Sequence, residues 1–436
     1  MALRLGDVCT KIGSGATPRG GSDVYVSSGV ALIRSQNVYN HGFHREGLAY
    51  LGETHAAELT GVEVRAGDVL LNITGDSVAR CCRAPADVLP ARVNQHVAII
   101  RPDPELLDPQ YLHYYLISPF KQAEMLSMAG GGGTRNALTK GMIEGYEIPA
   151  PDIDEQRAIA GVLGALDDKI EQNRRTSAAL ERLARAIFRA WFVDFEPVKA
   201  KAAGTASFPS MPQPEFDALP TRLVDSPLGP MPVGWEAGKL GDIAGERRET
   251  VDPSEVEPTT PYIGLEHMPR RCISLTEWEH AGKVTSGKAR FRAGQILFGK
   301  LRPYFHKVGI APLDGVCSTD IVVIEPKSRE WFGLTLGHAS SDDFVAHTNA
   351  CSTGTKMPRT NWRDMARYVI AVPPDTVARA FNDLVSAMTT LLVSAIFESR
   401  KLAQLRDYLL PKLISGEVRV RDTEPAVERA CAEQWA

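Results

Sequence analysis

Residues 148–192 read "IPAPDIDEQRAIAGVLGALDDKIEQNRRTSAALERLARAIFRAWF" and form one uninterrupted pattern near the middle of a 436-residue chain. Pro149 and Pro151 end the element before it, and no cluster of turn-forming residues follows until after Phe192. Asp152 has the position of an N-cap, and Glu155 three residues later completes a capping-box pattern. A helix of about forty residues is therefore predicted, spanning ~60 Å at 1.5 Å per residue, which is longer than a small domain is wide.

Apolar residues recur in this helix at steps of four and three, which is the period of a coiled coil. A buried Asn in such a seam costs stability but fixes the register, so Asn173 is expected to select one alignment with a partner helix. The predicted seam consists of Ile159, Leu163, Leu166, Ile170, Asn173, Ser177, Leu180, Ala184, Ile187 and Trp191.

A second long helix is predicted after Pro373-Pro374, with Asp375 as its cap and Gly416 just beyond its end. Pro411 is expected to kink its last turns. Each helix carries its apolar stripe on one face, so the two are predicted to pack on each other as a rod that holds two domains at a fixed separation. The alternative, two ordinary core helices, fits their length less well. The second seam is predicted at Phe381, Leu384, Met388, Leu391, Ala395, Glu398, Leu402, Leu405 and Leu409.

The remainder of the chain contains an internal repeat. Leu5-Gly6-Asp7-Val8 returns as Leu240-Gly241-Asp242-Ile243, and Arg65–Leu70 returns as Arg292–Leu297. A third match, Gly133-Thr134 followed by a strand-like run from Tyr146, returns as Gly354-Thr355 and a run from Tyr368. Three matches in the same order indicate a duplicated domain.

Short β-branched runs at 69–73, 93–100, 295–299 and 320–326 predict strands, and a helical pattern at 109–127 interrupts them. The predicted fold is therefore α+β, with two similar mixed α/β domains and two long helices. The segment between the halves is rich in Pro, Gly, Ala and Ser and is predicted to be a linker. The predicted organisation is a first domain at 1–150, a first long helix at 151–196, a linker at 197–234, a second domain at 235–373, a second long helix at 374–418 and a tail at 419–436.

Composition limits the class of protein. The net charge is −4, and no run approaches the ~20 apolar residues of a membrane span or the pattern of a signal peptide. Seven cysteines without a C-x-x-C motif indicate free thiols, so a cytoplasmic protein without a membrane contact is expected. Residues 281–313 hold seven Lys and Arg and no acidic residue. This basic run could neutralise phosphates or could be the solvated face of a sheet.

Four stretches carry a resemblance to a known family. They are "IPAPDIDEQRAIAGVLGALDDKIEQN" (148–173), "PLGPMPVGWEAGKLGDIA" (227–244), "GKLRPYFHKVGIAPLDGVCSTDIVVIEP" (299–326) and "LRDYLLPKLISGEVRV" (405–420). In their order, and with the duplication, they resemble the specificity subunit of type I restriction–modification systems over nearly the whole chain.

The resemblance implies a non-catalytic subunit in which each variable half is a target recognition domain. Each domain would read one half of a bipartite site in double-stranded DNA, and the antiparallel helices would set the unread spacer. The helices would also dock two methyltransferase subunits that modify adenine, and restriction and translocation subunits could join. No cofactor is expected on this chain, because S-adenosylmethionine would bind the methyltransferase partner. One departure is that "PPDTVARAFNDLV" lacks the pair Glu155-Gln156 of the first helix, so identical docking by both helices does not follow.

Base edges in the major groove are read by Arg, Lys, Asn and Gln, and the same residue types contact phosphates. Such residues are concentrated in loops of both halves. The candidates are Arg34, Gln36, Asn37, Arg80, Arg83, Thr134, Arg135, Asn136 and Lys140 in the first half, and Lys300, Arg302, Tyr304, Lys307, Lys356 and Arg359 in the second.

Two other classes of protein remain open. A protein-binding scaffold would suit the near-neutral charge, and the salt dependence of binding separates it from a phosphate reader. A self-contained DNA enzyme has two weak signals. Asp108-Pro109-Gln110-Tyr111 resembles the motif of amino-methyltransferases but has Gln110 for the second proline and fits a helix start. Asp320 with Glu325-Pro326-Lys327 has nuclease-like spacing, but Pro326 would disturb a metal-binding strand.

Two further patterns could indicate ligand sites. Gly130–Gly133 lacks the Lys-Ser/Thr of a phosphate-binding loop and is expected to be a loop tip. His41 and His44 have a possible ligand spacing, but no second pair completes a metal site, so surface histidines are expected.

Overall fold

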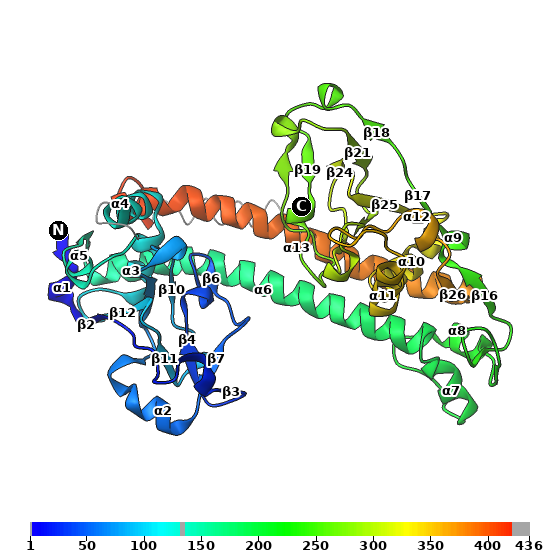
Figure 1. Cartoon of the computed structure of the whole chain (residues 1–436), viewed down its shortest axis with the longest axis horizontal. Helices are drawn as coiled ribbons and strands as arrows, with labels where there is room; N and C mark the ends of the chain where they lie inside the picture. Colours follow the sequence, from blue (N-terminus) through cyan, green and yellow to red (C-terminus); the bar gives the residue numbers. More distant parts are fainter. Residues whose placement is uncertain (1, 131–135, 421–436) are drawn as a thin grey trace. The chain divides into compact units, whose positions relative to one another are not determined.

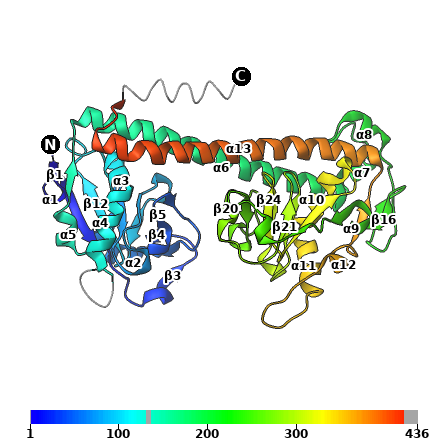
Figure 2. The ribbon, with the colours of Figure 1, turned by 90° about the horizontal axis from the view of Figure 1, so that it is seen from above.

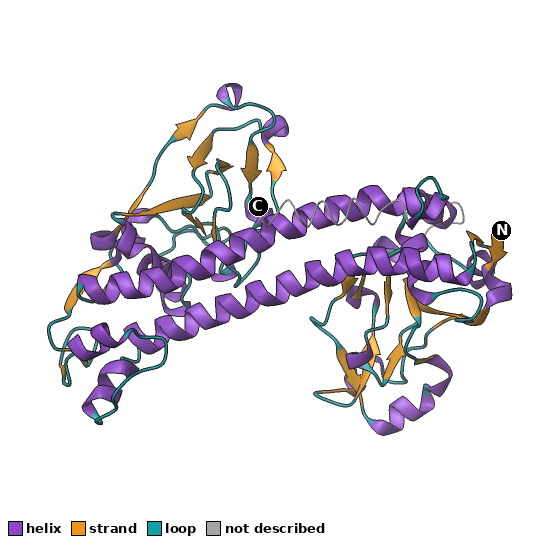
Figure 3. Cartoon of the chain, turned by 180° about the vertical axis from the view of Figure 1, so that it is seen from behind, coloured by secondary structure: helices purple, strands orange, loops and turns teal. Residues whose placement is uncertain are grey.

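The structure is a computed structural model that describes residues 2–130 and 136–420. The chain divides into two compact units, Met1–Lys169 with Lys401–Ala436, and Ile170–Arg400. Each unit contains one sheet-rich domain and a part of each of two long helices, α6 (Ile153–Phe192) and α13 (Asp375–Ser415) (Figure 1). The predicted α+β class is confirmed, and Figure 3 shows the strands gathered in the two domains.

The first domain is built on two sheets and a ribbon. A four-stranded antiparallel sheet has the order β10 (Cys81–Arg83), β9 (Val69–Asn72), β12 (Val97–Pro102), β2 (Cys9–Ser14). A five-stranded sheet has the order β3 (Tyr25–Val26), β7 (Ala49–Leu51), β4 (Val30–Ile33), β11 (Ala91–Val93), β8 (Glu63–Val64), and β5 (Val38–Tyr39) pairs with β6 (Gly42–Phe43). The ribbon joins β1 (Ala2–Arg4) to β13 (Glu147–Pro149). The helices are α1 (Leu5–Val8), α2 (Glu53–Glu58), α3 (Pro109–Ile117), α4 (Pro119–Gly130) and α5 (Lys140–Glu144).

The second domain repeats most of this topology. Its four-stranded sheet has the order β23 (Val308–Ile310), β22 (Ile296–Gly299), β25 (Ile321–Pro326), β17 (Ala244–Glu246). The five-stranded sheet has the order β20 (Glu279–His280), β19 (Pro261–Ile263), β24 (Gly315–Ser318), β21 (Lys288–Phe291), β18 (Thr250–Val251). The ribbon joins β16 (Glu236–Lys239) to β26 (Val369–Val372). The helices are α9 (Leu240–Ile243), α10 (Phe332–Ala339), α11 (Asp342–Ala350) and α12 (Trp362–Met365).

The repeat extends to strand direction. In each five-stranded sheet one pair is parallel, β4 with β11 and β19 with β24, while the neighbouring pairs are antiparallel. The four-stranded sheets have the same order, and so do four strands of the five-stranded sheets, β7-β4-β11-β8 and β20-β19-β24-β21, whereas the fifth strand, β3 or β18, lies at opposite edges. This agreement indicates a duplicated domain, since many other orders are possible. The predicted internal repeat is therefore confirmed in the fold.

One turn shows how the repeat keeps its geometry while the side chains change. In the first domain, the carboxylate of Asp68 accepts the backbone N–H of Arg65 at 2.7 Å and two bonds from the Arg101 guanidinium at 2.6 and 2.7 Å. In the second domain, Gln295 accepts the backbone N–H of Arg292 at 2.7 Å and donates to Glu325 at 3.0 Å. The same turn is thus closed by an ion pair in one copy and by an amide–carboxylate bond in the other.

The long helices pair antiparallel within each unit. In the first unit Arg406 of α13 donates to Asp167 of α6 at 2.7 Å, and Asp167 also accepts the Tyr114 hydroxyl at 2.7 Å. In the second unit Asn173 donates to Glu398 at 2.6 Å and to Ser399 at 3.3 Å. Asn173 is buried, which confirms its predicted place in the seam. Figure 2 shows α13 running beside α6 in both units.

The predicted seam is correct for α6 and partly wrong for α13. Ile159, Leu163, Leu166, Asn173, Ser177, Ile187 and Trp191 are buried, and Ile170, Leu180 and Ala184 are half-buried. In α13 Phe381 and Leu409 are buried and Leu384, Met388, Ala395, Glu398, Leu402 and Leu405 are half-buried. Leu391 is 59% exposed, whereas its neighbour Leu392 is buried. The internal repeat explains why Leu392, and not Leu391, lies in the seam. Tyr146 and Tyr368 are 222 residues apart, and the same offset relates Leu163 to Val385 and Ile170 to Leu392.

Helix α13 is also long and apolar enough to cross a membrane by length and composition. One apolar face of this helix packs in the protein core, because Phe381, Val385, Leu392 and Ile396 belong to the main cluster of the second unit. The helix continues through Pro411 to Ser415.

The segment 197–234 is folded, so the prediction of a structureless linker is wrong. It contributes to α7 (Glu196–Ala202) and contains α8 (Gln213–Ala218) and the ribbon of β14 (Leu223–Val224) with β15 (Met231–Pro232). Val198, Met211, Phe216, Leu219 and Met231 are buried in the core of the second unit. These residues are spaced among prolines and glycines with no helical or strand period, so the sequence pattern does not indicate that they are buried. Most of the predicted tail 419–436 lies outside the described residues.

Each domain also buries one histidine in the helix that follows its four-stranded sheet. Burial lowers the pKa of His113 in α3 to about 4 and that of His338 in α10 to about 3. An unfolded histidine has a pKa near 6.5, so between pH 6.5 and about 4 the unfolded chain binds more protons than the folded chain. Stability is therefore lost as the pH falls through this window.

We expect His338→Gln to reduce the acid sensitivity of the second unit. Between pH 7 and pH 5 its free energy of unfolding should fall by on the order of 1–2 kcal/mol less than in the parent, because glutamine takes up no proton. Hydrogen exchange at the two pH values, followed in peptides of the second unit, measures the difference. His280→Gln changes an exposed histidine and is the control. An unchanged pH dependence in His338→Gln would contradict this assignment.

Candidate nucleic-acid interface

Two loops meet at the same place in both domains. One follows the central strand of the four-stranded sheet, at 73–80 between β9 and β10 and at 300–307 between β22 and β23. Both loops are closed alike: Asn72 N–H donates to the Arg80 carbonyl at 2.8 Å, and Gly299 N–H donates to the Lys307 carbonyl at 2.8 Å. The residue before each closing position, Ala79 or His306, has a left-handed backbone with φ of 71° or 52°. Arg80 and Lys307 are therefore equivalent positions of the repeat.

The second loop follows β4 in the first domain and β19 in the second, each of which is the earlier strand of the parallel pair. In each domain a cation–π contact joins the second loop to the first loop. In the first domain the Arg80 guanidinium lies over the Tyr39 ring at 4.6 Å. In the second domain the Arg270 guanidinium lies over the Phe305 ring at 4.1 Å. Both domains therefore have this contact, but the arginine comes from the first loop in the first domain and from the second loop in the second domain.

Each contact belongs to a small aromatic and basic surface. In the first domain Tyr39 stacks on His44 at 4.1 Å, and exposed His41 lies beside it with Nε2 2.8 Å from that of His44. The prediction that both histidines lie at the surface is confirmed. In the second domain Tyr304, which is 50% exposed, contacts Phe305 at 4.8 Å. Aromatic faces with arginines suit nucleic acid, because the rings hold the cations in place and can stack on bases.

A third loop extends the surface of the second domain. Thr353 and Arg359 exchange two backbone hydrogen bonds, at 3.0 and 2.9 Å, and enclose a tip with exposed Lys356 and Met357. Arg302 connects this tip to the loop 300–307, since its guanidinium donates to the Lys356 carbonyl at 3.3 Å and lies 5.9 Å from the Phe305 ring. Burial, and then the nearby charge of Arg270, lower the pKa of Lys307. Several cations are thus held close together here.

Some predicted DNA contacts have structural partners in the first domain. Asn37 is fully buried and donates to the carbonyls of His44 at 2.9 Å and Glu46 at 3.3 Å, so the prediction that it reads a base is wrong. Arg34 donates to the Gly47 carbonyl and lies over Tyr25 at 5.5 Å, and Gln36 donates to the same carbonyl at 3.2 Å. These residues shape the second loop from inside.

The other residues predicted to contact DNA differ in how exposed they are. Arg359 pairs with Asp320 at 3.1 Å and Lys140 with Glu144 at 3.4 Å, and all four lie at the surface or near it. Lys300 is half-buried at the end of β22, while Arg83 and Asn136 are exposed. Thr134 and Arg135 lie outside the described residues, as do Gly131–Gly133. The predictions for the exposed residues stay open, and Tyr39, Arg270 and Phe305 are members of the surface that the sequence did not single out.

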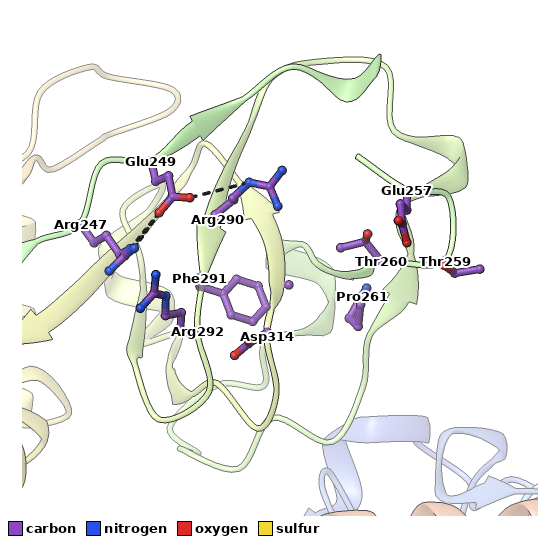
Figure 4. A pocket seen from close by; sticks show the side chains of 11 residues that line it. Arg247, Glu249, Glu257, Thr259, Thr260, Pro261, Arg290, Phe291, Arg292 and Asp314 are labelled. Atoms are coloured by element: carbon purple, nitrogen blue, oxygen red, sulfur yellow. Dashed lines mark hydrogen bonds and ion pairs between the residues drawn. The ribbon is translucent and has the colours of Figure 1, made fainter. Parts of the chain in front are cut away.

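The basic run 281–313 is not one surface. Arg290 and Arg292 line an open hollow of about 500 Å³ together with Arg247, and the residues that line it do not include the loop 300–307 (Figure 4). Glu249 pairs with Arg247 at 2.7 Å and with Arg290 at 3.8 Å, and Glu257 and Asp314 also line the hollow. Lys288 is buried and bound to Ser286 at 2.7 Å. The charges of the hollow are balanced, whereas Lys300, Arg302 and Lys307 of this run belong to the loop surface.

The two enzyme-like motifs have structural roles. Asp108 caps α3 by accepting the N–H groups of Gln110 and Tyr111 at 2.9 Å each, which confirms the predicted helix start. Asp320 pairs with Arg359, and Glu325 accepts a bond from Gln295, so the two carboxylates serve different contacts. Within residues 2–130 and 136–420 no group of three or more metal-ligating side chains is gathered.

Comparison with known proteins agrees with this architecture. Two similar domains on a pair of long helices also occur in the S subunit of a type I restriction–modification system from M. genitalium, whose crystal structure matches with a TM-score of 0.59 over 95% of both chains at 14% identity. This likeness defines the fold. It gives the class of protein as a chain of two similar α/β domains with a pair of long helices.

Sequence comparison then gives the relatives. The model of the type I restriction modification DNA specificity domain matches residues 2–182. The MjaIX specificity subunit of Methanocaldococcus jannaschii is 27% identical over 72% of this chain and 70% of its own length, and the HindI specificity subunit of Haemophilus influenzae is 23% identical over 81% and 87%. The chain is thus similar to type I restriction–modification specificity subunits over most of its length.

Proposed function

We propose that the chain reads a bipartite site in double-stranded DNA, one half with each domain, and carries out no catalysis itself. The observation that supports this most strongly is the repeated pair of loops with an arginine over an aromatic ring, Arg80 on Tyr39 and Arg270 on Phe305. A duplicated reading surface suits a target with two short halves, because each copy can change its side chains without disturbing the other.

The partners in this proposal are subunits that carry the chemistry. The long helices would dock two methyltransferase subunits, which would bind S-adenosylmethionine and modify adenine, and restriction subunits could join. Exposed apolar residues on α13, such as Leu391 and Phe397, offer contact area for such a partner. We infer a cytoplasmic setting from the free cysteines, six of which are in the described part of the chain.

The proposal is tested by mapping methylated adenines in the genome of a host with and without this gene. Loss of one motif with two short halves and a fixed unread gap supports it. Unchanged methylation in a host where the partner subunits are active would favour the scaffold alternative. A scaffold would also bind its partner with little dependence on salt, whereas a phosphate reader loses affinity steeply.

Exchange of the loop 300–307 gives a sharper prediction. A variant that carries this loop from a relative is expected to methylate a site altered in one half only, because the loop contacts Arg270 and the 353–359 tip within its own domain. The exposed hairpin 225–230, far from the loops in the fold of the second domain, is the matched exchange control. A change in both halves would contradict independent reading by the two domains.

A further inference from the structure

In the first unit an open groove of about 570 Å³ lies where the start of α6 meets the end of α13. Pro149, Pro151 and Ile159 line one side, and Leu413, Ile414 and Val418 line the other. Ile159, Leu413 and Ile414 are otherwise buried, so the floor of the groove is apolar. Asp152, Glu155 and Arg419 line the groove as well, so an amphipathic segment would suit it, with its apolar side on the floor and its polar side toward the charged residues.

The second unit contains the equivalent of this place. The repeat offset of 222 residues relates Leu409, Leu410, Leu413 and Ile414 at the end of α13 to Ile187, Phe188, Trp191 and Phe192 at the end of α6. All eight residues are buried, between 1% and 7% exposed. The same offset relates Ile159 to Phe381, which contacts Phe192 at 4.8 Å.

In the second unit this end of the helix pair is covered by the chain that follows α6. Phe195 and Val198 are buried in one cluster with Trp191, Phe192 and Phe216 of α8. The ring of Trp235 lies 5.5 Å from Phe195 and 5.8 Å from Phe192. The covering segment opens with Asp194-Phe195-Glu196-Pro197-Val198, and its Glu-Pro pair begins α7.

We propose that residues 421–436 cover the groove of the first unit, as the segment after α6 covers its equivalent in the second. Val418 and Val420 already pack against the core of the first unit, and Val418 and Arg419 line the groove, so the chain reaches residue 421 at this place. Sixteen residues would extend over ~24 Å as a helix.

The sequence of the segment supports this occupant. Asp422-Thr423-Glu424-Pro425-Ala426-Val427 repeats the Asp-x-Glu-Pro pattern that begins the covering segment in the second unit. After this Glu-Pro pair, apolar residues recur at helical spacing, at Val427, Ala430, Cys431 and Trp435. A helix that starts with Glu-Pro and has one apolar face could pack this face against the floor of the groove.

Cross-linking tests the contact directly in the full chain. Glu155→Cys places a thiol on the groove, and a short bismaleimide is expected to join it to the native Cys431, with the linked peptides identified by mass spectrometry. Asp168→Cys, at an exposed position of α6 outside the groove, is the matched control and should give at least tenfold less product. Cys431→Ser should abolish the product. Equal yields from positions 155 and 168 would overturn the proposal.

Hydrogen exchange gives the second readout. In the full chain residues 149–159 are expected to exchange at least tenfold more slowly than in a chain ending at residue 420, and Val427→Asp with Trp435→Ala should act like the truncation. Equal exchange in both chains overturns the proposal. So does protection that appears only when methyltransferase subunits are added, because the groove would then belong to a partner. Neither readout involves DNA, so the result is independent of the proposed function.

Discussion

Asp68→Ala is expected to lower the free energy of unfolding of the first unit by about 3–5 kcal/mol, because it leaves a largely buried guanidinium without its partner. Asp68 is fully buried, and the Arg101 side chain that it pairs with is 17% exposed. The variant also removes the acceptor of the Arg65 N–H, and a buried donor without an acceptor is costly. Denaturant unfolding followed by hydrogen exchange in peptides 63–103 measures the loss.

The repeat supplies the control for this prediction. Gln295→Ala removes the equivalent side chain of the second domain, and it leaves no buried cation behind. Its expected cost is about 1–2 kcal/mol, the value of lost neutral and charge-assisted hydrogen bonds. Equal losses for the two variants would show that the ion pair contributes nothing beyond the turn that both residues close. A smaller loss for Asp68→Asn than for Asp68→Ala is also expected, since the amide keeps the backbone acceptor.

The long helices were predictable from sequence because their signal is periodic over many turns. Asp152 does accept the N–H of Glu155, at 2.9 Å, and α6 spans the predicted range. The error at Leu391 arose from extending steps of four and three without the repeat. Either of two adjacent leucines fits an apolar stripe locally, and only the offset from Ile170 selects Leu392.

The folded segment after α6 and the loop surface were harder to predict, for a shared reason. The residues that cover Trp191 and Phe192 come from α7, α8 and Trp235, which are brought together by tertiary packing and follow no period. Similarly, Arg80 was a candidate by residue type, but its ring partner Tyr39 is forty-one positions earlier and belongs to another loop. Arg270 and Phe305 are likewise separated, by thirty-five positions, and belong to different loops. Partners of this kind are visible only once the loops are placed.

If the proposed function holds, Arg80→Ala and Arg270→Ala are each expected to weaken binding of the chain, together with its proposed methyltransferase partners, to a DNA site by roughly tenfold to a hundredfold, which corresponds to about 1–3 kcal/mol. The two residues belong to different domains and share no partner, so the losses should add in the double variant. Arg4→Ala removes an exposed charge on β1, which is not part of these loops, and should bind like the parent.

The salt dependence of binding separates a phosphate contact from base reading in these variants. If Arg80 contacts phosphate, Arg80→Ala reduces the slope of log affinity against log salt by about one, and Arg80→Lys restores it because the charge returns. If the guanidinium of Arg80 instead reads a base through two hydrogen bonds, Arg80→Lys is expected to bind DNA as weakly as Arg80→Ala. Sequence specificity should then be reduced in only one half of the target. Tyr39→Leu tests the ring itself: it keeps every charge but removes the surface that holds Arg80 at 4.6 Å, so affinity should fall while the salt slope stays unchanged. Parent-like affinity in both arginine variants would exclude the paired loops as the DNA-binding surface.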